Sequence, residues 1–365
     1  MNKNNFEKIF SKKDIIEILK IKHEQSINNL FKQARELKIK TLEKDVYLRG
    51  LIEFSNICFK NCFYCGIRNE NKHLKRFLMS EEEIFESINQ ARKMNINSIV
   101  LQSGENKSKK FIDQTATLIK KIKELNSRID ITLSCGEQNP STYERWFKEG
   151  AKRYLLRIET SNQNIYEKIH PVDENHNFKK RLKCLSSLKK IGYQVGSGMI
   201  IGLPFQTLEN IAMDILFLKD IDVDMVGLGP YIEHPNTPIS LNLKKQNFNH
   251  YTDTPGKRFD LTLKTIAILR LIMKDINIVS STALEAIEPM GRINALEVGA
   301  NVIMQNLTLD KYKNHYFLYE KKIYFETLTH LEKEIINSGS FINYSSQGDP
   351  KHYLKRKEIE QGRFL

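Results

Sequence analysis

Three cysteines packed into eight residues are the feature of this sequence that points most directly to chemistry. Cys58, Cys62 and Cys65 form a CxxxCxxC pattern within SNICFKNCFYCGIRNEN, and the aromatic residue Tyr64 directly precedes the last of them. Three thiolates can hold three irons of a cubane iron–sulfur cluster, which leaves the fourth iron open to a small bidentate molecule. The pattern therefore predicts a 4Fe-4S cluster with one free coordination site.

A zinc site is the alternative interpretation of the same cysteines. A structural zinc ion requires a fourth Cys or His to complete a tetrahedron. His73 is the nearest candidate, but it lies in the polar stretch NENKHLKR without ligand spacing. Cys135 and Cys184 stand alone, and we expect each to be a small buried or helix-face residue. The spacing thus favours the cluster over zinc.

Composition indicates a folded globular chain. Of its 365 residues, 40% are hydrophobic and 28% are charged, which is near the globular average. The net charge of +13 could indicate a nucleic-acid partner, but the lysines are scattered along helix-like segments and no nucleic-acid-binding motif is found. Residues 1–22 lack the apolar region of a signal peptide, and no apolar run is long enough to span a membrane. We therefore expect a cytoplasmic protein with no nucleic-acid or membrane partner.

Short apolar runs alternate with helix-like segments along most of the chain. Eight runs, each followed by an amphipathic stretch, lie at 46–54, 98–102, 130–134, 153–159, 194–203, 224–229, 276–281 and 300–304. An eightfold alternation of buried strands and helices predicts an α/β fold, a (βα)8 TIM barrel. Helical spacing at 13–42 precedes it. We expect a helical N-terminal extension at 1–43, the barrel at 44–306, and a C-terminal helical extension at 307–365.

Residues that follow the strands are expected to meet at one mouth of the barrel, because functional groups gather at the carboxyl ends of its strands. The cysteine loop follows the first strand. The second strand ends in Gln102-Ser103-Gly104-Glu105. Its glycine would let backbone amides approach a bound amino-acid group, and its acid can accept an ammonium group.

The fourth strand brings a cation and a carboxylate to the same mouth. Arg157 and Glu159 have the same inward parity on this strand. An arginine inside a barrel requires an anion, which is either Glu159 or a bound carboxylate. Arg181, in the following helical segment, is a second candidate for binding a carboxylate. A solvated helix residue beside Lys179 and Lys180 is the equally supported alternative.

The fifth and seventh strands end in residues with two possible roles each. The run GSGMIIGLPFQT is rich in glycine, which suits either a nucleoside lying against the backbone or a bulge with close packing. Ser281 and Thr282 follow the seventh strand and can direct two hydroxyls into the barrel. They can equally form the N-cap of the next helix.

The order and spacing of these segments resemble the HydE family of radical S-adenosylmethionine enzymes, FeFe-hydrogenase maturases of the biotin synthase-like branch. The resemblance covers most of residues 45–325, including VLQSGE, ITLSCGE, RYLLRIETSN, DVDMVGLGPYIEHPNTPI and SSTALEAIEPMGRINALEVGANVIMQNLT. It implies a barrel of the radical S-adenosylmethionine type. It also implies reductive cleavage of S-adenosylmethionine at the cluster, and use of the 5′-deoxyadenosyl radical in assembling the two-iron subcluster of the hydrogenase.

The resemblance also assigns site residues and partners. It implies cluster binding by Cys58, Cys62 and Cys65. It places near S-adenosylmethionine the residues Tyr64, Gln102, Ser103, Glu159, Arg181 and Met225. It places around the substrate, as catalytic candidates, Arg157, Ser281, Thr282 and Thr132. The implied substrate is a cysteine-bound iron carbonyl cyanide unit made by HydG, and the implied partners are other hydrogenase maturation proteins and a reductant such as ferredoxin or flavodoxin.

Two departures from the family pattern and three rival functions remain. The chain has RIET at 157–160 where the family usually has RHET, and Gln305 where it often has proline. No cysteine follows Cys184, so we expect a single cluster. The rivals are a lysine mutase like PylB, which makes methylornithine, and a non-catalytic iron–sulfur scaffold or carrier. Biotin synthase would need ligands for a second cluster, which the remaining cysteines do not supply.

Overall fold

A closed parallel barrel forms the centre of the computed structural model, which describes residues 10–246, 254–319 and 327–361. Parts of the two predicted extensions, residues 1–9, 320–326 and 362–365, lie outside the described residues. The barrel strands are β1 Asp45–Ser55, β2 Ser98–Ser103, β3 Asp130–Ser134, β4 Ala151–Leu155, β5 Gln194–Ser197, β7 Met225–Gly227, β9 Asn277–Ser280 and β10 Val302–Asn306. Each pairs in parallel with its neighbour, and β10 pairs back onto β1. The predicted eight-stranded barrel is confirmed.

Two of the predicted strands are interrupted near the barrel mouth. The run predicted as one strand at 194–203 divides into β5 and β6 Ile200–Ile201, and β6 pairs with β8 Gly229–Pro230. The interruption lies at Gly198, where a Cβ atom would fall 1.7 Å from the carbonyl oxygen of Gly227. Close backbone packing, one of the two roles considered for this glycine-rich run, therefore accounts for Gly198.

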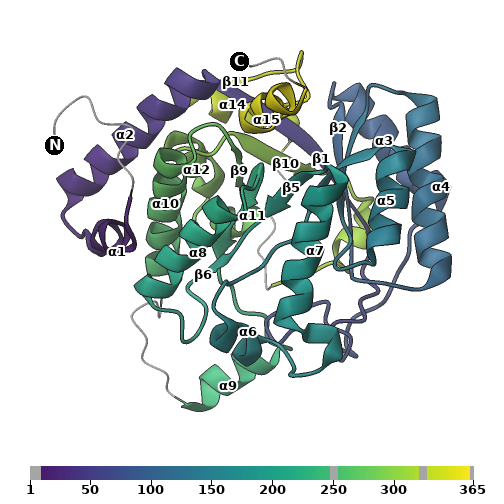
Figure 1. Cartoon of the computed structure of the whole chain (residues 1–365), viewed down its shortest axis with the longest axis horizontal. Coiled ribbons are helices and arrows are strands. Elements are labelled where there is room, and N and C mark those ends of the chain that lie inside the picture. Colours follow the sequence, from purple (N-terminus) through teal and green to yellow (C-terminus); the bar gives the residue numbers. More distant parts are fainter. Residues whose placement is uncertain (1–9, 247–253, 320–326, 362–365) are drawn as a thin grey trace.

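A layer of helices surrounds the strands (Figure 1). It consists of α3 Glu81–Lys93, α4 Lys109–Leu125, α5 Pro140–Glu149, α6 Gln163–Ile169, α7 Phe178–Ile191, α8 Leu208–Asp220, α9 Pro238–Gln246, α10 Pro255–Ile272, α11 Thr282–Glu285 and α12 Gly291–Glu297, with a 3-10 turn at Glu174–His176. Several begin at residues that favour helix starts. Ser80 and Glu83 form a capping box at α3, and Thr207 and Asn210 do the same at α8.

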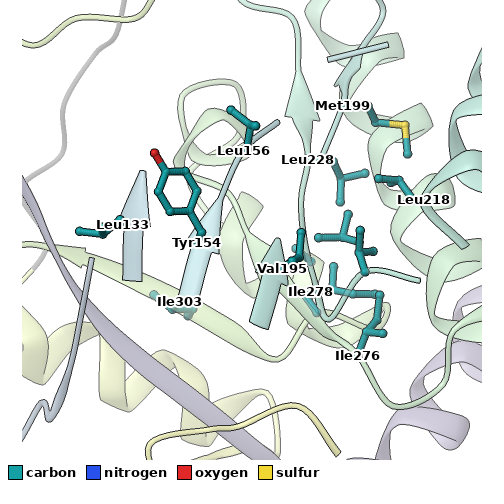
Figure 2. Packing of buried hydrophobic residues seen from close by; sticks show 14 of the residues in the cluster. Leu133, Tyr154, Leu156, Val195, Met199, Leu218, Leu228, Ile276, Ile278 and Ile303 are labelled. Atoms are coloured by element: carbon teal, nitrogen blue, oxygen red, sulfur yellow. The ribbon is translucent and has the colours of Figure 1, made fainter. Parts of the chain in front are cut away.

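The hydrophobic core lies between the strands and this helical layer. Side chains alternate along each strand, so every second residue leaves the barrel and meets a helix. Figure 2 shows Leu228, between β7 and β8, and Ile278 of β9 near Leu218 of α8. All three side chains are buried. The residues of opposite parity face the barrel interior, where apolar side chains such as Leu51 and Leu155 lie beside polar ones.

The segments at both ends of the described chain pack onto the barrel. The N-terminal helices α1 Lys12–Lys20 and α2 Glu24–Leu42 contact α8 and α10. The C-terminal segment holds α13 Asp310–Lys313, α14 Leu328–Asn337, β11 Phe341–Ile342 and α15 Lys351–Glu360. Strand β11 pairs with the first residues of β1, outside the closed barrel. No described helix is both long and apolar enough to cross a membrane.

The loop before α15 covers the amino-terminal end of the barrel. Arg153 of β4 is 1% exposed there, and its Nη2 lies 2.6 Å from Asp349 Oδ1 and 2.8 Å from Asp130 Oδ2. The side-chain amide of Asn277 donates to the carbonyl of Gly348 at 2.7 Å. A buried guanidinium is tolerated only where acceptors surround it. The loop supplies such acceptors to the floor of the barrel.

Replacing Asp349 with alanine would leave the buried Arg153 with a single carboxylate. We expect Asp349→Ala to lower the free energy of unfolding by about 2 kcal/mol, measured by urea titration with circular dichroism. The matched control is Glu360→Ala, which removes an exposed pair with Lys357 and should change nothing measurable. Equal stability of Asp349→Ala and the unmodified protein would contradict this role of the loop.

Candidate active site

A cavity of about 900 Å³ opens at the carboxyl ends of the strands. It is lined by side chains from the ends of most barrel strands and from the loops that follow them. It brings together eleven of the thirteen residues predicted for the site, namely Cys58, Cys62, Tyr64, Cys65, Gln102, Ser103, Arg157, Glu159, Arg181, Ser281 and Thr282. These residues thus meet at one place, as expected for groups at the carboxyl ends of the barrel strands.

Thr132 and Met225 do not line this cavity, and their predicted positions need correction. Thr132 is buried in the middle of β3, and Ser134, two residues further on, lines the cavity instead. Met225 opens β7, and its sulfur accepts a hydrogen bond from Arg49 at 3.0 Å inside the barrel, while Gly227 lines the cavity. Two residues along a strand correspond to about 6.6 Å. Both residues point to the predicted face of their strand, but each lies about one layer deeper than the cavity, so the predictions placed them too high.

The cysteine loop is held against the turn that follows β2. The backbone N–H of Glu105 donates to the Cys58 sulfur at 3.3 Å, and the Phe59 N–H donates to the Glu105 carbonyl at 2.8 Å. A Cβ atom on Gly104 would lie 2.5 Å from the Ile57 carbonyl oxygen. Glycine at this position is therefore required by the contact between the two loops. Hydrogen bonds to cysteine sulfur are also one of the features that tune iron–sulfur clusters.

The three thiols lie in surroundings that oppose their ionisation. Burial raises the pKa of Cys62 to about 12, and the neighbouring Cys58 thiolate adds to the shift. Burial and the same neighbours raise the pKa of Cys65 well above its ordinary value. Metal ligands must be deprotonated thiolates, so a metal centre must supply positive charge to these sulfurs. Without a metal these side chains are therefore neutral thiols, and a bound centre would have to displace their protons.

Arg76 places a cation next to this loop. Its guanidinium donates to the backbone carbonyls of Asn56 at 2.7 Å, Ile67 at 2.8 Å and Arg68 at 2.5 Å, which lie on both sides of the cysteines. Burial lowers the pKa of Arg76, while the nearby Cys58 and Cys65 thiolates raise it. The side chain thus closes the loop and provides charge opposite the sulfurs.

These features fit a cluster with three cysteine ligands. His73, the candidate fourth ligand of a zinc site, is exposed on the surface. Across 10–246, 254–319 and 327–361, no group of three or more His, Cys, Asp or Glu side chains is placed to hold a single metal ion. Three thiols, a backbone donor to one sulfur and an adjacent cation are the observations that carry the fit.

Arg157 and Glu159 form an ion pair at the cavity wall. Arg157 Nη2 lies 2.9 Å from Glu159 Oε2 and donates to the Met199 carbonyl at 3.0 Å. One third of the Arg157 side chain is exposed to the cavity, and its buried Nε has no hydrogen-bond partner. Burial raises the pKa of Glu159, although Arg157 opposes the shift. The pair leaves a donor of Arg157 free for a ligand.

Asp214 of α8 fixes the turn that carries Glu159, and the sequence did not reveal it. Its carboxylate accepts from the Ser161 N–H at 2.5 Å, from the Ser161 hydroxyl at 2.6 Å and from the Thr160 hydroxyl at 3.3 Å. Glu159 itself has a positive φ of 66°, a conformation that non-glycine residues adopt at a cost. Burial raises the pKa of Asp214 to about 6. A lone acid on the apolar helix IAMDILFL was the available signal.

Arg181 and Glu105 have protein partners that the sequence did not indicate. Arg181 is buried on α7, with its Nε 2.6 Å from Glu137 Oε1 and its Nη1 donating to the Arg157 carbonyl at 2.6 Å. The interpretation of Arg181 as a solvated helix residue is therefore wrong. Glu105 was expected to accept an ammonium group from a ligand, but its carboxylate pairs with Lys107 at 2.8 Å.

Two hydroxyls and one further acid also line the cavity. Ser281 stands at the N-cap of α11 without making a side-chain cap bond, and its buried hydroxyl has no hydrogen-bond partner. The Thr282 hydroxyl lies 2.9 Å from the hydroxyl of Tyr319. Glu53 of β1 also lines the cavity and accepts from the Asn306 side chain at 3.0 Å. The inward parity of Glu53 on β1 would have predicted it.

Comparison with known proteins first shows which superfamily the chain resembles. The model of the radical SAM superfamily matches residues 52–218, from β1 through most of α8. Members of this superfamily use a 4Fe-4S cluster and S-adenosylmethionine, which agrees with the fold and with the cysteine loop. Together with a relative that is 43% identical over 86% of the chain, this match shows that the chain is a radical S-adenosylmethionine enzyme.

Relatives narrow the class. The [FeFe] hydrogenase maturase subunit HydE of Thermotoga maritima is 43% identical over 314 residues, which are 86% of this chain and 85% of that protein. The chain belongs to the HydE family. The 3-methylornithine synthase of Methanosarcina acetivorans is more distant, with 27% identity over 81% of this chain and 79% of that protein.

Solved structures share the fold at low identity. Methylornithine synthase (PylB) has a TM-score of 0.77 and 20% identity, covering 93% of this chain and 96% of that one. The FeFe-hydrogenase maturase HydG of Carboxydothermus hydrogenoformans has a TM-score of 0.78 and 21% identity, covering 96% of this chain and 80% of that one. These likenesses bear on the barrel and its attached helices.

Arg76 should be required for retention of iron. We expect Arg76→Gln to retain less than half of the iron of the unmodified protein after anaerobic reconstitution, because the loop loses its carbonyl contacts and the sulfurs lose a nearby cation. Iron is measured by colorimetric assay and the cluster by visible absorbance. Arg145→Gln, which removes an exposed arginine of α5, is the control. Full iron content in Arg76→Gln would show that the loop closes without this residue.

Proposed function

We propose that this chain is a HydE-type maturase that cleaves S-adenosylmethionine and uses the resulting radical in assembling the two-iron subcluster of FeFe-hydrogenase. The observation that carries the proposal is 43% identity to a HydE across 86% of the chain, together with a cysteine loop that opens into the barrel cavity. The proposed division is a helical extension at 1–43, the catalytic barrel at 44–306 and a C-terminal extension at 307–365.

The first half of the proposed site binds the cofactors. Cys58, Cys62 and Cys65 would hold the cluster. When bound, the cluster supplies the electron that breaks a sulfur–carbon bond of S-adenosylmethionine and releases the 5′-deoxyadenosyl radical. Around it, polar and aromatic side chains of the cavity would orient S-adenosylmethionine, and these are Tyr64, Gln102, Ser103, Glu159 and Arg181. The acceptor oxygens of the Glu159 carboxylate suit hydroxyl donors such as those of a ribose.

The second half of the proposed site binds the substrate. Arg157 Nε and Ser281 Oγ are buried without hydrogen-bond partners at the cavity. Buried polar atoms in a folded protein are normally paired, and the Arg157 side chain, one third of which is exposed, lines the cavity where a ligand with acceptor atoms can approach it. The carboxylate of an amino acid is such a ligand. We therefore propose that Arg157, Ser281 and Thr282 bind a cysteine that carries an iron carbonyl cyanide unit.

The proposed partners follow from this chemistry. The iron-bearing cysteine would come from HydG, and the product would pass to other hydrogenase maturation proteins. Reduction of the cluster requires one electron at a time, which a carrier such as ferredoxin or flavodoxin would provide. We place the reaction in the cytoplasm.

An assay for cleavage of S-adenosylmethionine distinguishes an enzyme from a non-catalytic iron–sulfur scaffold. The reconstituted protein should release 5′-deoxyadenosine when given dithionite and S-adenosylmethionine, as measured by chromatography. We expect Cys62→Ser to abolish the product, since one iron loses its ligand. Cys184→Ser is the matched control, because this cysteine lies outside the cavity lining. An intact cluster that yields no 5′-deoxyadenosine would favour the scaffold.

Maturation in cells tests the substrate. Expression of the chain in cells that lack HydE should restore hydrogenase activity. Arg157→Gln should reduce the recovered activity at least tenfold, because it removes the guanidinium proposed to donate hydrogen bonds to the substrate carboxylate. The control is Lys152→Gln, which changes an exposed lysine of β4, the strand that precedes Arg157. Conversion of lysine to methylornithine by the purified protein, without any hydrogenase activity in cells, would instead assign the mutase function.

A further inference from the structure

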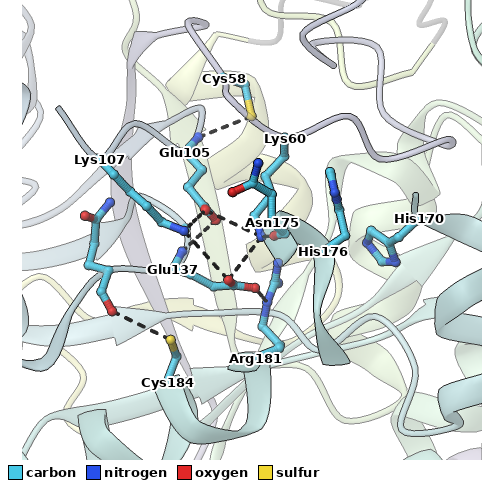
Figure 3. Close-up of polar contacts among 12 residues, drawn as sticks. Cys58, Lys60, Glu105, Lys107, Glu137, His170, Asn175, His176, Arg181 and Cys184 are labelled. Carbon is cyan, nitrogen blue, oxygen red and sulfur yellow. Dashed lines mark hydrogen bonds and ion pairs between the residues drawn. The ribbon is translucent and has the colours of Figure 1, made fainter. Parts of the chain in front are cut away.

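A group of charges lies beside the cysteine loop, four of them buried and the fifth, Lys107, with a side chain that is 30% exposed, and we name it the charge network. Its members are Lys60, Glu105, Lys107, Glu137 and Arg181 (Figure 3). Lys60 belongs to the cysteine loop itself, between Cys58 and Cys62. Its Nζ lies 3.0 Å from Glu137 and 3.5 Å from Glu105. The cluster loop therefore carries its own cation into the network.

The orientation of Lys60 is opposite to what solvation alone would produce. Lys60 is 4% exposed, whereas its neighbour Phe59 is 49% exposed. Lysine is among the residues that are almost never buried unless they are paired, and phenylalanine is among those most often buried. The loop thus turns an apolar ring outward and an ammonium group inward. This reversal indicates that the position of the Lys60 charge matters.

The remaining contacts fix the composition of the network. Arg181 Nε lies 2.6 Å from Glu137, and Lys107 Nζ lies 2.8 Å from Glu105. Burial would raise the pKa of Glu137, but Arg181 and Lys60 outweigh it and hold the pKa at about 2. Three cations therefore face two carboxylates. The network carries one more positive than negative charge.

The network cannot move away from the cysteines, because its backbone is tied to theirs. Glu105 donates its N–H to the Cys58 sulfur at 3.3 Å. On the other side of Lys60, the Asn61 N–H donates to His176 Nε2 at 2.8 Å, and the Lys60 ammonium donates to the Asn175 carbonyl. Figure 3 shows Lys60 between these two sides. The loop is therefore held on both flanks around its buried cation.

We propose that the charge network holds an excess positive charge against the cluster and raises its reduction potential, with Lys60 as the positioning residue that couples the network to the loop. The proposal rests on the proposed function, since it requires the cluster. One electron passes from the reductant to the cluster, and no bond is formed or broken. Added negative charge is stabilised by a nearby cation, and buried charges are screened little by salt.

A contribution to folding stability does not by itself explain why these charges are buried. Desolvation of buried ion pairs often cancels their attraction, so apolar residues of similar size serve stability as well. Net charge near an iron–sulfur cluster, by contrast, is one of the factors that set its potential. The network therefore suits redox tuning better than packing.

Two variants that change the charge of the network in opposite directions test this inference. Lys60→Gln removes a positive charge and should lower the midpoint potential, whereas Glu137→Gln removes a negative charge and should raise it. We expect each to change the ratio of reduced to oxidised cluster about tenfold at a fixed potential, which is about 59 mV for one electron. The potential is measured by mediated dithionite titration of the full-length reconstituted protein, followed by electron paramagnetic resonance.

Control variants distinguish the effect of the Lys60 charge from the effect of its side-chain shape. Lys60→Arg keeps the charge and should keep the potential, and Lys120→Gln removes an exposed charge of α4 and should have no effect. If Lys60→Gln fails to retain iron, Lys107→Gln takes its place with the same expected sign. Shifts of equal sign in the lysine and glutamate variants, or no shifts with intact clusters, would overturn the proposal. An unmodified protein without any reducible cluster would instead refute the proposed function.

Discussion

Closure of the parallel barrel places chemistry at one mouth, because β10 pairs with β1 and every strand then points the same way. Inward side chains at the carboxyl ends must meet around a common space, while outward ones pack on helices. Arg157, Glu159 and Ser281 reach the cavity by this constraint, although they are far apart in sequence. The cysteine loop adds the remaining wall, and its contact with Glu105 joins the first two strand ends into one unit.

Periodicity and spacing were sufficient to predict the barrel and the mouth at which its functional residues meet, but they did not name most of the residues that line the cavity. They predicted which face of a strand a residue occupies but not its position along the barrel axis. The predictions therefore placed Thr132 and Met225 one layer too close to the cavity. Height depends on where each strand begins relative to its neighbours. This register is set by contacts between distant segments, such as the pairing of Met225 with Asn277, which no local pattern contains.

Other residues could not be predicted because their roles depend on loop orientation. Asp214 looks like an isolated acid in an apolar helix, and its importance appears only when α8 meets the turn after Glu159. Lys60 looks like a surface lysine beside a phenylalanine that should be buried, yet the structure reverses the two. In both cases the sequence contains the residue type, and tertiary packing decides which side of the chain it faces.

The loop around Asp349 has a consequence for the order in which the protein is made. Arg153 is buried in the barrel floor, and one of its two carboxylate partners follows it by nearly two hundred positions. On the ribosome the strands β1 to β10 emerge before that partner, which follows the end of β10 by about 43 residues. The nascent barrel must therefore hold an incompletely neutralised arginine until Asp349 arrives. The floor of the barrel is therefore completed only after all eight barrel strands have been made.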